Sequence, residues 1–82
     1  MYTYKTSGTC ARSIDFDIDE SGIITAVSFQ GGCNGNLKGI SRLAIGRPAA
    51  EIIDALKGVT CGNKPTSCPD QLARALEEAI NA

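Results

Sequence analysis

The stretch Ser13–Gln30, SIDFDIDESGIITAVSFQ, decides the fold of this 82-residue chain. After Ser13, residues 14–19 alternate between apolar and acidic side chains, a period of two that is typical of a half-buried β-strand. The apolar members are Ile14, Phe16 and Ile18. Residues 19–22, DESG, favour a tight turn, and residues 23–30 return to strand-forming side chains. The stretch therefore predicts two antiparallel strands, 13–19 and 23–30, joined as a hairpin.

The rest of the chain adds one short strand and three helices to this hairpin. YTYK at residues 2–5 predicts a third strand, whereas residues 36–45, 47–58 and 68–80 carry apolar residues at helical spacing. The expected apolar stripes are Leu37, Ile40, Leu43 and Ala44; Ala49, Ile52, Ile53 and Leu56; and Leu72, Ala75, Leu76, Ala79 and Ile80. We therefore predict a single α+β domain over residues 1–82, with a small antiparallel sheet of two or three strands covered on one face by three helices.

Specific residues mark where two of these helices begin and end. Pro48 stands at the start of the second helix, and Gly58 follows it as a C-terminal cap. Ser67 and Asp70 have the spacing of a capping box at the start of the last helix.

Composition narrows the classes of function. The formal net charge is −1, so the chain has no basic field of the kind that binds nucleic acid. No stretch approaches the roughly 18 apolar residues of a membrane span, and the polar N-terminus does not have the pattern of a signal peptide. We expect a cytoplasmic protein. In that compartment four cysteines indicate metal or redox chemistry before structural disulfides.

All four cysteines fall at the ends of predicted elements, outside the apolar stripes. They are Cys10, Cys33, Cys61 and Cys68. Cys33 and Cys68 stand where helices begin, and helix N-termini favour the thiolate, which is the form that binds a metal. With no histidine in the chain and a small aliphatic core, the four fit a closed tetrahedral thiolate site. The sequence predicts this metal site, most simply for zinc.

The spacing of the cysteines leaves other interpretations open. It separates them by 22, 27 and six residues, which lacks the paired C-x₂-C knuckles of a typical zinc site. A redox-active pair, with Cys61 and Cys68 as the exchanging thiols, is the first alternative. Disulfides or simple packing of the thiols are the remaining ones.

Three stretches carry a resemblance to a known family. SGTC at 7–10, SFQGGCNGNLKGI at 28–40 and TCGNKPTSCPDQLARAL at 60–76 resemble the stand-alone TSCPD-domain proteins, a four-cysteine family named for the motif found here at residues 66–70. The resemblance covers nearly the whole chain and implies a metal-binding module held by the four cysteines. The same domain is appended to some ribonucleotide reductases, so the resemblance also implies a protein partner, such as a reductase subunit.

A fainter likeness points to the U-type iron–sulfur scaffold proteins. GGC at the end of a strand and a cysteine opening an amphipathic helix are similar to their pattern, and Cys10, Cys33 and Cys68 would be the three counterparts. The likeness implies a scaffold-like fold and an iron–sulfur cluster as the alternative to zinc. This chain departs from the pattern by adding Cys61. A fourth thiolate closes the site, which favours a structural or regulatory zinc over cluster transfer.

Other motifs favour structural roles. The glycines at 31, 32 and 35 lack the lysine and serine of a phosphate-binding loop, and Asp15, Asp17 and Asp19 are typical of a solvated strand face rather than a cation site. No histidine or paired carboxylates offer a general acid–base site, and 82 residues leave no room for the barrel and radical site of a ribonucleotide reductase. We therefore expect a binding or accessory module and no catalysis by the isolated chain.

Overall fold

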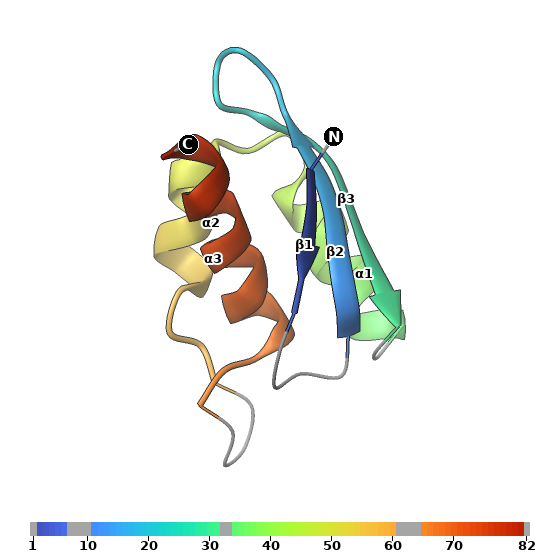
Figure 1. Cartoon of the computed structure of the whole chain (residues 1–82). Helices are drawn as coiled ribbons and strands as arrows, with labels where there is room; N and C mark the ends of the chain where they lie inside the picture. Colours follow the sequence, from blue (N-terminus) through green and yellow to red (C-terminus); the bar gives the residue numbers. More distant parts are fainter. Residues whose placement is uncertain (1, 7–10, 32–33, 61–64, 82) are drawn as a thin grey trace.

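The computed structural model describes residues 2–6, 11–31, 34–60 and 65–81. Three strands come first along the chain and three helices follow (Figure 1). The elements are β1 (Tyr2–Lys5), β2 (Ala11–Ile18), β3 (Ile24–Gly31), α1 (Asn34–Ala44), α2 (Ala49–Leu56) and α3 (Cys68–Ile80). The strands form one antiparallel sheet in the order β1-β2-β3. The predicted α+β fold is confirmed, and residues 2–5 do add the third strand.

The register of the sheet places the apolar residues on one face. Phe16 of β2 lies between Tyr2 of β1 and Val27 of β3, and its ring stacks on that of Tyr2 with centroids 5.2 Å apart. Ile14 and Phe16 are buried, whereas Asp15 lies on the opposite, exposed face and accepts a hydrogen bond from Thr3. Strand pairing therefore converts the alternation of the sequence into one buried and one wet side.

The three helices pack against the buried face of the sheet. Their buried apolar side chains join those of the strands in one cluster: Ile14, Phe16, Ile24, Ala44, Ala49, Ile52, Ile53, Leu72, Ala75 and Leu76. Pro48 precedes the first turn of α2, and Gly58 follows its C-cap with φ +87°, the left-handed conformation that glycine adopts most readily. In the described part of the chain, no helix is long and apolar enough to cross a membrane.

Two residues of the predicted stripes are not in the core. Leu43 is 67% exposed, and Ser41 is buried instead because its hydroxyl donates to the carbonyl of Leu37. Ile80 is 46% exposed, while Ala73 is fully buried. The expectation for Leu43 and Ile80 was wrong. Apolar spacing does not show that Ser41 is buried with its hydroxyl bonded to a carbonyl, or that Ile80 is the last residue of α3.

The β2–β3 turn and the α1–α2 turn lie together at one end of the domain (Figure 1). Backbone hydrogen bonds join them: Ile24 N donates to Arg47 O, Gly46 N donates to Ile24 O, and Ala49 N donates to Gly22 O, at 2.8–2.9 Å. These two turns form the closed end of the domain. The described segments that lead toward the cysteine positions begin or end at the other end of the domain.

Candidate functional site

The start of α3 is built by the motif Thr66–Asp70. Ser67 is the N-cap residue, with an extended backbone, and its hydroxyl oxygen accepts a 3.2 Å hydrogen bond from the N–H of Asp70. The hydroxyl in turn donates to the carbonyl of Val59. Cys68 therefore opens a helix whose first turn is fixed by its neighbour's side chain.

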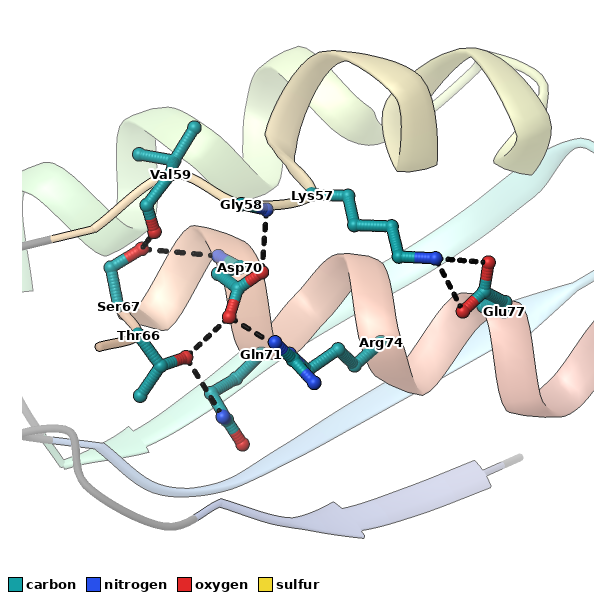
Figure 2. Close-up of polar contacts among 9 residues, drawn as sticks. All are labelled: Lys57, Gly58, Val59, Thr66, Ser67, Asp70, Gln71, Arg74 and Glu77. Atoms are coloured by element: carbon teal, nitrogen blue, oxygen red, sulfur yellow. Dashed lines mark hydrogen bonds and ion pairs between the residues drawn. The ribbon is translucent and has the colours of Figure 1, made fainter.

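Asp70 carries a fully buried carboxylate three residues into this turn. One oxygen accepts a 2.7 Å hydrogen bond from the backbone N–H of Gly58, and the other accepts from the Thr66 hydroxyl and from Nε of Arg74, the latter at 2.9 Å (Figure 2). Burial raises the pKa of the Asp70 carboxyl, but these donors and the positive charge of Arg74 outweigh burial and hold the pKa below its ordinary value. The carboxylate is therefore ionised and satisfied, and it serves as an anchor.

These contacts fasten the start of α3 to the end of α2. Gly58 bonds to Asp70, and Val59 bonds to Ser67. Farther along the same two helices, Nζ of Lys57 pairs with the carboxylate of Glu77 at 2.8 Å. Both ends of the segment between Val59 and Ser67 are thus held to each other by side chains.

Of the four cysteines predicted to bind a metal, one lies within the described residues. Cys68 is half-buried at the first position of α3. Cys10, Cys33 and Cys61 lie outside the described residues, and so do residues 62–64 of the segment between Cys61 and Cys68. Within the described ranges, no group of three or more histidine, cysteine or acidic side chains is placed to hold a metal ion.

The described residues next to these positions gather at one end of the domain. Ala11, which follows Cys10 in the sequence, pairs with Gly31, two residues before Cys33. Figure 1 shows the start of α3 at this same end, together with the start of α1. The described segments next to the cysteine positions therefore begin or end on one side of the domain.

The other motifs considered from the sequence have structural roles. Asp15 accepts hydrogen bonds from Thr3 and Gln30 on the wet face of the sheet. Asp19 accepts from the N–H groups of Ser21 and Ile23 and so closes the β2–β3 turn. Gly31 has φ +82° and lies against Arg12, so its role in β3 is a sharp change of direction. Gly32 lies outside the described residues.

Sequence reasoning missed the network around Asp70. Asp70 appeared as the partner of Ser67 in a capping box, yet its carboxylate accepts from Gly58, Thr66 and Arg74. Gln71 extends the network by donating to the Thr66 hydroxyl at 2.9 Å. The spacing of four residues from Asp70 to Arg74 was a signal for one part of it, since residues four apart share one helix face. Thr66 precedes the helix, so no helical spacing marked its contact with Asp70.

The fold and this site define a class: a two-layer α+β domain whose last helix starts at a capped, cysteine-bearing turn anchored by a buried aspartate. The model of the TSCPD domain family matches residues 2–80, so the chain belongs to the TSCPD domain family. Comparison with curated proteins and with solved structures gave no match.

Proposed function

We propose that this chain is a metal-binding accessory domain that holds one zinc ion through its four cysteines and works by binding a protein partner. The ligands would be Cys10, Cys33, Cys61 and Cys68. One observation supports this most. The described residues next to these positions, Ala11, Gly31 and the start of α3, lie at the same end of the domain.

The chemistry of the donor set supports the same proposal. Four thiolates and no histidine suit a closed tetrahedral site for zinc, which supplies structural energy and offers no open position for catalysis. The positive end of α3 offsets part of the negative charge that four thiolates bring to one divalent ion. The anchor between Asp70 and Gly58 would hold Cys68 and the segment that contains Cys61 in a fixed relation.

The partner that the family resemblance offers is a reductase subunit, since this domain is also found appended to ribonucleotide reductases. In that role the chain serves the large enzyme as a binding module, and copurification with a large reductase subunit is the expected sign. A thiol redox role for Cys61 and Cys68 and an iron–sulfur cluster are the competing functions, and the metal content separates them.

The test is metal analysis of protein purified without oxygen, because oxygen destroys an exposed cluster and lets zinc take its place. We expect one zinc per chain and negligible iron. Cys68→Ser should lose the zinc. Ser67→Ala is the matched control, because it removes the cap of the same turn and keeps all four thiols. Stoichiometric iron with sulfide would establish the cluster, and metal-free protein with full structure would favour the redox pair.

A further inference from the structure

One edge of the sheet lacks the features that normally block strand addition. β3 is an edge strand of eight residues and contains no charged residue and no proline. The opposite edge, β1, is only four residues long and includes Lys5. Edge strands expose unpaired backbone N–H and C=O groups, and proteins usually protect them by short length, charge or irregularity.

The protection that β3 does have is confined to its start. The α1–α2 turn bonds both backbone groups of Ile24. Between the two register shifts of the β2–β3 pair, Ala26–Gln30 is regular, and no strand lies on its outer side in the described part of the chain. This stretch is therefore a template for a fourth strand.

A hollow lies beside this free edge, between β3 and α1. Its volume is about 230 Å³, and it is lined by Val27 and Phe29 from β3 and by Leu37, Lys38 and Ser41 from α1. Sites for whole small molecules are larger, at roughly 300–1,000 Å³. The hollow is large enough to take one apolar side chain of an added strand.

The charges around the hollow have one sign. α1 carries Lys38 and Arg42, both exposed, and contains no acidic residue. Arg12 lies against Gly31 at the end of β3, with its Nε 3.5 Å from the position that a Cβ would take on that glycine. Asp15, the acid of the neighbouring strand that bonds to Gln30, lies on the opposite face of the sheet.

We propose that the free edge of β3, Ala26–Gln30, binds an extended acidic segment of a partner protein by strand addition. One apolar side chain of that segment fills the hollow, and acidic side chains two residues before and after it share its face and meet Lys38 and Arg42. A second copy of this chain is disfavoured, because paired β3 edges would bring two positively charged α1 helices together. This inference adds the partner's chemistry to the accessory role proposed above, and it does not depend on the metal.

The probe is the fluorescent peptide TETLTET, which as a strand places leucine and both glutamates on one face. The peptide TTELETT has the same composition and charge but places its glutamates on the face opposite the leucine. We expect TETLTET to bind the full chain more tightly than TTELETT does, and methylation of alternate backbone nitrogens in TETLTET to abolish binding. Hydrogen exchange should slow at amides of Ala26–Gln30 and stay unchanged in β1.

Charge reversal completes the test. Lys38→Glu should weaken binding of TETLTET at least about fivefold, whereas Lys5→Glu, the same change on the opposite edge of the sheet, should leave it within about twofold. Equal affinity for both peptides, equal effects of both variants, or protection at β1 would overturn the proposal. So would a dimer whose formation protects Ala26–Gln30, because the edge would then belong to a second copy. Failure of the peptide in zinc-replete protein would leave the metal proposal intact.

Discussion

The carboxylate of Asp70 accepts a 2.7 Å hydrogen bond from the backbone N–H of Gly58, twelve residues earlier in the chain. The bond joins the first turn of α3 to the residue that follows the C-cap of α2, and the carboxylate is fully buried where it does so. The aspartate that ends the TSCPD motif is thus a tie between two helices rather than a free acid beside Cys68.

Asp70→Asn should destabilise the domain by about 1–3 kcal/mol, because an amide cannot accept from Gly58, Thr66 and Arg74 together and brings its own donors into a buried site. Chemical denaturation at matched zinc content measures the loss. Asp54→Asn, which neutralises an exposed acid on α2, is the control and should change stability by less than about 0.5 kcal/mol. Equal stability of both variants would show that the buried tie contributes nothing.

The exposure of Leu43 gives a second prediction. Leu76→Ala should cost about 2–5 kcal/mol, because it opens a cavity in the core cluster. Leu43→Ala removes the same atoms from a side chain that is 67% exposed and should stay within about 0.5 kcal/mol of wild type. The same denaturation experiment compares the two. A large loss at Leu43 would place that residue in a covered interface.

Removal of the metal should loosen the whole domain. Structural zinc contributes on the order of 10 kcal/mol to the folding of small peptides. A contribution of only about 2 kcal/mol would raise the unfolding midpoint of a domain this size by about 10 °C. Thermal unfolding of zinc-loaded and chelator-treated protein measures the shift, and restored zinc should reverse it. A midpoint that moves by only a few degrees would mean that the metal is cargo.

Thiol labelling separates zinc from the redox pair. With all four cysteines bound to zinc, a thiol reagent should react slowly with native protein until a strong chelator is added. A redox pair predicts instead two fast thiols, Cys61 and Cys68, which form a disulfide reversibly. Peptide mapping of the labelled protein identifies the sites. Four fast thiols in metal-replete protein would contradict the zinc proposal.

The sequence predicted the sheet well because its signal is local. The alternation over 13–19 and the turn at Asp19–Gly22 each depend on adjacent residues, and the structure confirms both. The role of Asp70 was harder to predict because its partner Gly58 offers only a backbone N–H, which any residue but proline possesses. The same limit hid Ser41, whose burial rests on a hydrogen bond to a carbonyl.

The two ends of this domain are held by different means, and that difference sets how it opens. At the closed end, backbone hydrogen bonds join the two turns through Gly22, Ile24, Gly46, Arg47 and Ala49. The start of α3 is held to the end of α2 by side-chain hydrogen bonds. Native-state hydrogen exchange of chelator-treated protein should therefore show a gradient along the molecule, with the amides of Ile24 and Ala49 slower than those near the start of α3. Such a gradient would let the end that contains Cys68 open and close on its own, while the bonds between the β2–β3 and α1–α2 turns stay intact.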